Sequence, residues 1–250
     1  MKVILLSAGR GERLKPLTKE IPKCLIKISD KYTILSYQLK EIRKSGVKDI
    51  LIVIGHIADK IEDTLSKSDK YSLNIKTIYN PFYYLTNNLV SLWLTTQYLD
   101  GDFTVINGDD IFEASVLSQL LNESKEGITM VVSVKERYSE EDMKVILKNG
   151  KVCRVGKEID QEAANGESIG MICFKGKGAK TVRKTLDMMI RNQEFHQSFW
   201  LSAIQQIIDE QNVPVMYLEV SSNLWTEIDF HQDVNNAKRY VHEKVKDILD

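Results

Sequence analysis

The sequence predicts a single-domain α/β protein, a Rossmann-like three-layer sandwich in which helices cover both faces of a mixed, mostly parallel sheet. In residues 1–126, continuous apolar runs alternate with stretches of helical periodicity, the pattern of buried parallel strands and crossover helices. From residue 127 onward the apolar runs are shorter and include a hairpin signal, Asn149-Gly150. With 250 residues and 43% hydrophobic content, the chain can bury one sizeable core, and no Pro-, Gly- or Ser-rich linker divides it.

The first half repeats a strand–helix unit. Gly46 is a typical stop for the helix before it, and Asn87 is a typical residue at the start of the helix after it. We expect strands at residues 2–6, 49–54, 73–79 and 103–106, and helices at residues 33–46, 57–65 and 87–94.

The second half begins with short strands and ends with helices. We expect strands at residues 128–134, 143–147, 151–155, 168–174 and 215–220, and helices at residues 179–191, 199–210 and 232–246. The polar segment 225–229 directly precedes the closing helix.

Charge and cysteine content exclude several classes of function. Lys plus Arg, 34, nearly balances Asp plus Glu, 35, so no global field favours nucleic acid or an anionic membrane, and a small-molecule substrate fits better. Cys24, Cys153 and Cys173 are odd in number and lack metal-ligand spacing, which indicates a reducing compartment. Because the chain also shows neither a signal-peptide core nor an apolar stretch of membrane-spanning length, we expect a cytoplasmic protein.

A glycine-bearing loop follows the first strand. Gly9 and Gly11 are separated by one residue, which lets the backbone turn sharply and brings successive N–H groups close to an anion. Arg13 and Lys23 supply positive charge nearby. The spacing therefore favours a phosphate-binding loop, although two glycines alone also fit a surface loop without a ligand.

Two common phosphate-loop motifs do not fit. A Walker loop needs Gly-Lys-Ser/Thr, whereas Glu12 and Arg13 follow Gly11. A dinucleotide fingerprint needs a third small residue where Leu14 stands, and an acid after the second strand, where the chain has Gly55. The loop therefore matches neither motif, and the longer string around it must distinguish a different phosphate-binding class from a surface loop without a ligand.

Residues 6–18 read Leu-x-Ala-Gly-x-Gly-x-Arg-Leu-x-Pro-x-Thr, with Pro-Lys at 22–23. This pattern closely resembles the signature of the nucleotidyltransferase superfamily, whose GT-A-like enzymes make activated sugars and polyol or amino-alcohol phosphates. The resemblance implies that the loop wraps a nucleoside triphosphate and that Lys23 and Arg13 are catalytic cations. It implies these nucleotide-binding residues: Leu6, Ala8, Gly9, Gly11, Arg13, Gly55, Asn88 and Ser91.

Two carboxylates complete the inventory. The strand at 103–106 ends in Asn-Gly-Asp-Asp, and in open α/β sheets ligands lie beyond the carboxyl ends of strands. The family resemblance assigns Asp109 and Asp229 to Mg²⁺, which takes one or two protein carboxylates and completes its shell with water and phosphate oxygens. A turn at Asp109-Asp110 and a helix cap at Asp229 are the alternatives, and Glu227 is a further possible ligand.

These residues suit nucleotidyl transfer, in which an acceptor oxygen attacks the α-phosphorus in line and pyrophosphate leaves. Both reactants are anions, so catalysis consists mainly of positioning and charge neutralisation. No covalent nucleophile is needed, and His56, His196, His231 and His242 are scattered outside any nucleophile motif.

Beyond the loop, the chain resembles the bacterial branch that joins CTP to phosphocholine, 2-aminoethylphosphonate or a similar acceptor. The marks are Asn87-Asn88 with Ser91, and residues 142–145, 166–170 and 225–229. The resemblance implies a preference for CTP, a nucleotide-binding half at about 1–126 and an acceptor-binding half at about 127–250. A homodimer is also possible for such an enzyme.

The acceptor site is predicted less directly. Lys144, Glu167 and Trp225 are the candidate acceptor-binding residues, although an exposed strand lysine is an equally good interpretation of Lys144. Trp200, Trp225, Tyr83 and Tyr84 could wall an ammonium group or simply belong to the core. A sugar 1-phosphate or inositol phosphate acceptor, and a non-catalytic pyrophosphorylase-like subunit, remain as alternatives that pyrophosphate release would distinguish.

Overall fold

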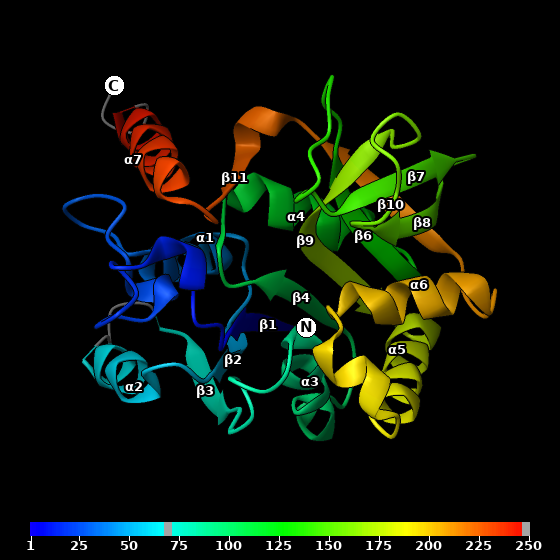
Figure 1. Cartoon of the computed structure of the whole chain (residues 1–250), viewed down its shortest axis with the longest axis horizontal. Coiled ribbons are helices and arrows are strands. Elements are labelled where there is room, and N and C mark those ends of the chain that lie inside the picture. The colour runs from blue at the N-terminus through cyan, green and yellow to red at the C-terminus, as the bar shows by residue number, and fades with distance from the viewer. Residues whose placement is uncertain (68–71, 247–250) are drawn as a thin grey trace.

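The computed structural model describes residues 1–67 and 72–246 and has a central sheet between two layers of helices (Figure 1). The strands are β1 (Lys2–Ser7), β2 (Asp49–Ile54), β3 (Asn74–Tyr79), β4 (Phe103–Asn107), β5 (Asp110–Phe112), β6 (Gly127–Ser133), β7 (Lys144–Lys148), β8 (Lys151–Gly156), β9 (Gly166–Lys175), β10 (Val215–Val220) and β11 (Trp225–Glu227). The helices are α1 (Ile34–Lys44), α2 (Ala58–Ser66), α3 (Asn88–Trp93), α4 (Ala114–Glu123), α5 (Lys177–Met189), α6 (Leu201–Asp209) and α7 (His231–Lys246).

The main sheet has the strand order β3-β2-β1-β4-β9-β6-β10-β8-β7. Its pairings make β8 and β9 antiparallel to the other strands, so in the described part of the chain seven of nine strands point the same way. The predicted mixed, mostly parallel sheet is therefore confirmed. The antiparallel strands lie in the second half, as the hairpin signal at Asn149-Gly150 indicated.

Strand β1 lies between β2 and β4 and runs parallel to both. Leu6 pairs with Val53 on one side and with Asn107 on the other, so the three carboxyl ends lie at one edge of the sheet. The Gly108 N–H also donates to the Leu6 carbonyl at 3.0 Å. This register brings the loop after β1 next to the turn that holds Asp109.

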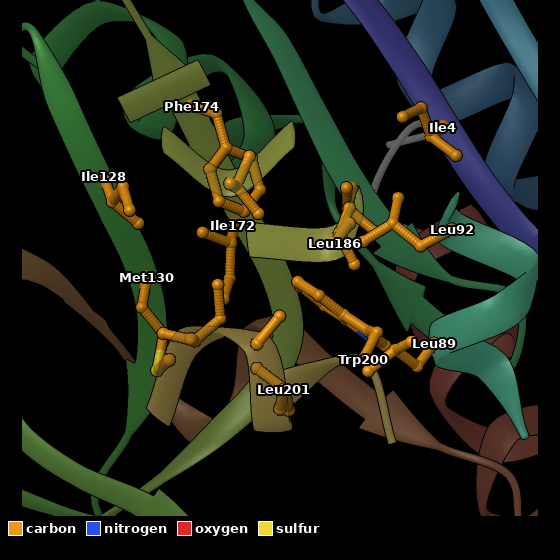
Figure 2. Packing of buried hydrophobic residues seen from close by; sticks show 14 of the residues in the cluster. Ile4, Leu89, Leu92, Ile128, Met130, Ile172, Phe174, Leu186, Trp200 and Leu201 are labelled. Atoms are coloured by element: carbon orange, nitrogen blue, oxygen red, sulfur yellow. The ribbon is translucent and has the colours of Figure 1, made fainter. Parts of the chain in front are cut away.

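The two faces of the sheet carry different helices. On one face α3, α5 and α6 bury Leu92, Leu186 and Trp200 against Ile4 and Phe174 of the strands (Figure 2). On the other face α1, α2 and α4 pack with residues such as Leu39, Ile61 and Leu117. The alternation of side chains in each strand supplies both layers, because successive residues point to opposite faces.

Three elements in the described structure, α4, β5 and β11, were not expected from the sequence. Helix α4 buries Val116, Leu117 and Leu120, a spacing that would have indicated it. The short strands β5 and β11 pair antiparallel in a separate two-stranded sheet. Strands of three residues are too short to leave a periodic pattern.

Helix α7 packs on a smaller hydrophobic cluster outside the main sheet. Val234, Ala237 and Val241 of this helix are buried against Ile26 and Ile28, which follow the glycine-bearing loop in the chain. Within the described residues, no helix combines the length and apolar character needed to cross a membrane.

Candidate active site

A cleft of about 460 Å³ opens at the carboxyl ends of β1 and β4. Both halves of the chain contribute to its walls. Of the residues predicted for the site, the structure places these in the lining: Leu6, Ala8, Gly9, Gly11, Arg13, Lys23, Asn88, Ser91, Asp109 and Asp229.

The glycines of the loop have different roles. Gly11 has φ +59°, and a Cβ there would lie 2.9 Å from Thr18 Cγ2 and 3.2 Å from Lys23 Cβ. Glycine at 11 therefore lets the loop fold back on Thr18, whose hydroxyl donates to the Gly11 carbonyl at 2.8 Å. A Cβ at Gly9 would meet no described atom within 4 Å, so the fold itself does not require glycine there.

Gly55 supports this loop from behind and does not line the cleft. A Cβ at Gly55 would lie 2.7 Å from the Ala8 carbonyl oxygen and 2.6 Å from Tyr83 Cβ. The adjacent His56 N–H donates to the same Ala8 carbonyl at 3.2 Å. Glycine is therefore required at position 55, because a side chain there would collide with the loop.

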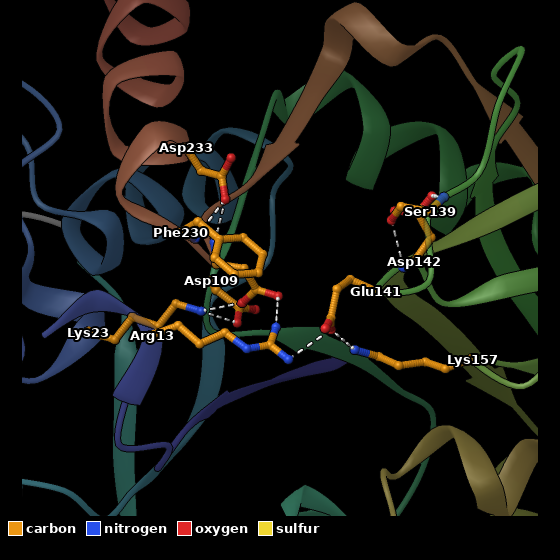
Figure 3. Close-up of polar contacts among 10 residues, drawn as sticks. Arg13, Lys23, Asp109, Ser139, Glu141, Asp142, Lys157, Phe230 and Asp233 are labelled. Atoms are coloured by element: carbon orange, nitrogen blue, oxygen red, sulfur yellow. Dashed lines mark hydrogen bonds and ion pairs between the residues drawn. The ribbon is translucent and has the colours of Figure 1, made fainter.

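Lys23 joins the two predicted carboxylates. Its ammonium lies 2.7 Å from Asp109 Oδ2 and 2.9 Å from Asp229 Oδ1, and its side chain is only 15% exposed (Figure 3). Burial alone would lower the pKa of Lys23, but the two carboxylates outweigh burial and hold that pKa above its usual value. Lys23 therefore stays positively charged at neutral pH.

The β5–β11 pairing brings Asp109 and Asp229 together. The Ile228 N–H donates to the Asp109 carbonyl at 3.2 Å, directly beside both carboxylates. The Asp229 carboxylate accepts from Lys23 and Arg13, whereas the Asp233 carboxylate accepts from the amides of residues 229 and 230 at the start of α7. The interpretation of Asp229 as the helix cap is therefore wrong.

The same arrangement gathers three acids. One carboxylate oxygen from each of Asp109, Glu227 and Asp229 lies within 4.8 Å of the others. Desolvation in the cleft and repulsion from Asp109 and Asp229 raise the pKa of Glu227 to about 8. Burial would raise the pKa of Asp229, but the positive charges of Lys23 and Arg13 lower it.

These three acids fit a hard divalent cation. Carboxylate oxygens are the preferred ligands of such ions, and the Lys23 ammonium already shows that a cation is stabilised between two of them. Asp110, by contrast, is only 1% exposed, and burial raises its pKa well above the usual value. The predicted acidic pair is thus divided: Asp109 faces the cleft and Asp110 faces the core.

Arg13 reaches across the cleft to the second half of the chain. Its guanidinium lies 2.8 Å from Glu141 Oε2 and 3.5 Å from Asp229 Oδ2 (Figure 3). The same Glu141 oxygen lies 2.9 Å from Lys157 Nζ. Glu141 and Lys157 were missed from the sequence. Lys157 follows β8, which runs antiparallel to most of the sheet, so the rule that places ligands beyond the carboxyl ends of parallel strands does not select it.

Asn88 and Trp200 form a fixed wall of the cleft. The backbone N–H of Trp200 donates to the Asn88 side-chain oxygen at 2.8 Å. The indole N–H of the same residue donates to Asn107 Oδ1 at 3.0 Å. Ser91 is held by Asn80, whose side-chain amide donates a hydrogen bond to its hydroxyl at 3.0 Å. These contacts position polar groups beside the loop before any ligand binds.

The structure does not bring Lys144, Glu167 or Trp225 into the described cleft lining. Lys144 is 1% exposed and donates to the carbonyls of residues 139, 140 and 142, so the exposed-lysine interpretation is also wrong. Glu167 pairs with Lys135 at 2.6 Å, and Trp225 packs against the core cluster beneath α1 and α4. Lys144 and Glu167 are therefore explained by partners outside the cleft, whereas the buried Trp225 Nε1 has no hydrogen-bond partner among the described residues.

Among the predicted aromatic residues, Tyr83 and Trp200 line the cleft, whereas Tyr84 is 58% exposed outside it. Phe199 lies in the lining beside Lys157, whose ammonium is 5.2 Å from the ring centroid. The second half of the chain therefore offers the cleft a cation, a carboxylate and aromatic surface.

The fold and the cleft define a nucleotide-transferring α/β enzyme, and the comparison with known families agrees. Residues 2–241 match the nucleotidyl transferase family, to which the chain therefore belongs. The family resemblance seen in the glycine-bearing loop is confirmed.

Two curated relatives match almost end to end. The chain is 26% identical to the CTP:phosphoglutamine cytidylyltransferase of Campylobacter jejuni, over 94% of this chain and 98% of that protein. It is 27% identical to the choline-phosphate cytidylyltransferase of Streptococcus pneumoniae, over 93% and 95%. The solved structure of the inositol-1-phosphate CTP transferase from T. maritima shares the fold, with a TM-score of 0.80, 22% identity and coverage of 97% and 96%.

Proposed function

We propose that this enzyme transfers CMP from CTP to a small phosphorylated or phosphonate acceptor and releases pyrophosphate. The observation that carries the proposal is the Lys23 ammonium held between Asp109 and Asp229, beside a loop with the family's phosphate-binding pattern. The two near-full-length relatives are both named as cytidylyltransferases, which supports CTP as the nucleotide.

We assign nucleotide binding to residues 1–126. Gly9 and Gly11 approach the triphosphate, and Asn88 and Ser91 face the base and ribose. The exocyclic amine of cytosine donates a hydrogen bond where uracil presents an acceptor. An unmatched buried group costs about 1–3 kcal/mol, so CTP should be preferred to UTP by roughly ten- to a hundredfold.

We propose that Lys23 and Arg13 are the catalytic cations. In the structure both lie against the carboxylates of the cleft, and both are placed to move onto phosphate oxygens when a triphosphate binds. Their charge neutralises the α-phosphate and the departing pyrophosphate, while the loop holds the attacking and leaving oxygens in line. No side chain needs to form a covalent bond.

We propose Mg²⁺ as the cofactor. Asp109 and Asp229 would hold the ion, with Glu227 as a third candidate ligand, because these acids form the carboxylate cluster of the cleft. When bound, a divalent cation supplies further charge neutralisation of the phosphates.

The acceptor phosphate is assigned to Lys157 in place of Lys144. Lys157 lies in the cleft and already binds one anion, the Glu141 carboxylate, which it shares with Arg13. An acceptor phosphate in that position would lie next to the catalytic cations. The aromatic side chains of Trp200 and Phe199 nearby favour an amino-alcohol phosphate or aminophosphonate over a sugar or inositol phosphate.

Residues 127–250 thus become the acceptor-binding half. The cleft receives second-half residues from the segments around 141–143, 157, 168–170 and 199–201, which supports this division, while Glu227 and Asp229 of the same half are the proposed metal ligands. We also propose a homodimer and a cytoplasmic location. The location is supported by the cysteines, which are all free thiols in the described structure.

A pyrophosphate-release screen tests the function. CTP, UTP, ATP, GTP and dTTP are each combined with phosphocholine, 2-aminoethylphosphonate, inositol 1-phosphate and glucose 1-phosphate, and kcat/KM is measured for every pair. CTP with an amine-bearing acceptor should give the highest value. A preference for UTP or dTTP with the sugar phosphate would move the enzyme to the sugar branch, and absence of pyrophosphate with every pair would favour a non-catalytic subunit.

A further inference from the structure

A second groove, here named the α7 groove, has a volume of about 690 Å³ and lies between the turn at 27–32 and helix α7. Among the described residues, its lining shares none with the active cleft. Helix α7 lies at the edge of the molecule, beside the N-terminal segments that carry this turn (Figure 1). The lining residues are Lys27, Ile28, Ser29, Asp30, Lys31, Tyr32, Lys238, Arg239, Val241 and His242.

The lining is strongly basic. Five of its ten side chains are Lys, Arg or His, against one acid, Asp30, although the whole chain is balanced at 34 basic and 35 acidic residues. In the described part of the chain, no carboxylate pairs with Lys27, Lys31 or Lys238. Among the described residues, these charges therefore produce a local positive field.

The walls of the groove are ordered by contacts of their own. In the turn, the Ile28 N–H donates to the Tyr32 carbonyl at 2.9 Å, and the Ser29 hydroxyl accepts from the Tyr32 N–H at 3.0 Å. Ile28 and Val241, which form the floor, are both fully buried. On the helix, Lys238 and His242 are four residues apart and so lie on one face.

Both walls of the groove are close in sequence to residues of the proposed catalytic centre. The turn continues the short helix Lys23–Leu25, and α7 begins two residues after Asp229. Beneath the groove, Ile26 and Ile228 belong to the same hydrophobic cluster as Val241. An anion that bridges the turn and the helix would therefore fix the segments that carry Lys23 and Asp229.

We propose that the α7 groove is a second anion site that binds a small phosphate-bearing molecule. Lys27 and Lys31 on the turn and Lys238 on the helix line one groove from its two walls, and a phosphate group, which carries several charged oxygens, is the kind of anion that more than one lysine can contact. The site does not depend on the function proposed for the cleft.

The test is an NMR titration that follows the imidazole signals, with His242 assigned through the His242→Gln variant. Inorganic phosphate, inorganic pyrophosphate and CTP are added separately without divalent metal, so that the three arms distinguish free phosphate, product and nucleotide as the source. The His242 signal should shift saturably at millimolar concentrations of at least one anion.

Variants separate the groove from the cleft. The shift should disappear in the double variant Lys27→Ala with Lys238→Ala, and persist in the matched control Lys148→Ala with Lys180→Ala, which removes two exposed lysines elsewhere. It should also persist in Lys23→Ala, where anion binding in the cleft is weakened. A wild-type His242 signal that does not move, or that moves equally in the groove variant, would overturn the proposal.

Discussion

Lys23 is the side chain on which the charge balance of the cleft depends. Its ammonium lies between two carboxylates and offsets part of their charge, and in the proposed reaction it lies where the reacting phosphates come. The residue thus has a structural role in the free protein and a catalytic role in the proposed reaction.

We expect Lys23→Ala to lower kcat by about a hundredfold or more, because the loss of one electrostatic contact to the reacting group typically costs several kcal/mol. Circular dichroism and thermal unfolding check that the fold is retained. Lys23→Arg, which keeps the positive charge, should recover part of the activity. Near-normal kcat in a folded Lys23→Ala protein would remove this residue from the mechanism.

In the proposed mechanism, Glu141 competes with the acceptor phosphate for two cations. Its carboxylate holds both Arg13 and Lys157 in the free protein, so an acceptor phosphate must displace it. We expect Glu141→Gln to lower the KM of the acceptor by about two- to fivefold, since each half-exposed ion pair contributes at most about 1 kcal/mol. Glu140→Gln, at the neighbouring exposed position, is the control. A higher KM would instead assign Glu141 to direct acceptor binding.

In the loop after β1, the fold requires glycine at position 11 but not at position 9. Gly11 has a positive φ and close neighbours, whereas a Cβ at Gly9 would meet no described atom within 4 Å. The two positions look alike in the sequence, but their surroundings differ.

We expect Gly11→Ala to lower the melting temperature, because the left-handed backbone and the contact with Thr18 both disfavour a side chain. Gly9→Ala should leave the melting temperature unchanged and weaken CTP binding, since its methyl group would occupy space at the cleft where the phosphates approach. Thermal unfolding and CTP titration measure the two effects. Equal behaviour of the two variants would refute the distinction.

At the scale of the whole molecule, the cleft is assembled from segments that are distant in the sequence. Lys23 and Asp229 are 206 residues apart, and Arg13 and Glu141 are 128 apart. Such a site forms only when the whole sheet and the β5–β11 pair are in place, so local unfolding of α7 or β11 should abolish it.

Dependence of turnover on a divalent metal tests whether the distant residues Asp109 and Asp229 act together. We expect turnover to require Mg²⁺ and to stop when EDTA is added, to be abolished in Asp109→Asn and to be strongly reduced in Asp229→Asn, because an amide keeps the shape but not the charge that holds a hard cation. Asp59→Asn, an exposed residue of α2, is the control. Full activity in EDTA would exclude the metal mechanism, and an unaffected Asp229→Asn enzyme would leave Asp109 as the main ligand.

The sequence alone determined the α/β class, most helix and strand positions, and the glycine-bearing loop with Arg13 and Lys23. These features are readable because apolar periodicity, helix ends and glycine spacing are local properties of the chain. The family signature in residues 6–23 is likewise contiguous, so it needed no knowledge of the fold.

Only the tertiary structure decided which distant side chains meet. The β5–β11 pairing placed Asp229 beside Asp109 and made Asp110 a core residue. The end of β8 brought Lys157 into the cleft, whereas Lys144, at the start of β7, buried its ammonium against the carbonyls of residues 139, 140 and 142. Strand pairing and burial depend on the packing of the whole sheet. The type of one residue does not indicate which residue pairs with it on the neighbouring strand. A lysine in a strand therefore looked the same in the sequence whether its ammonium met backbone carbonyls or the open cleft.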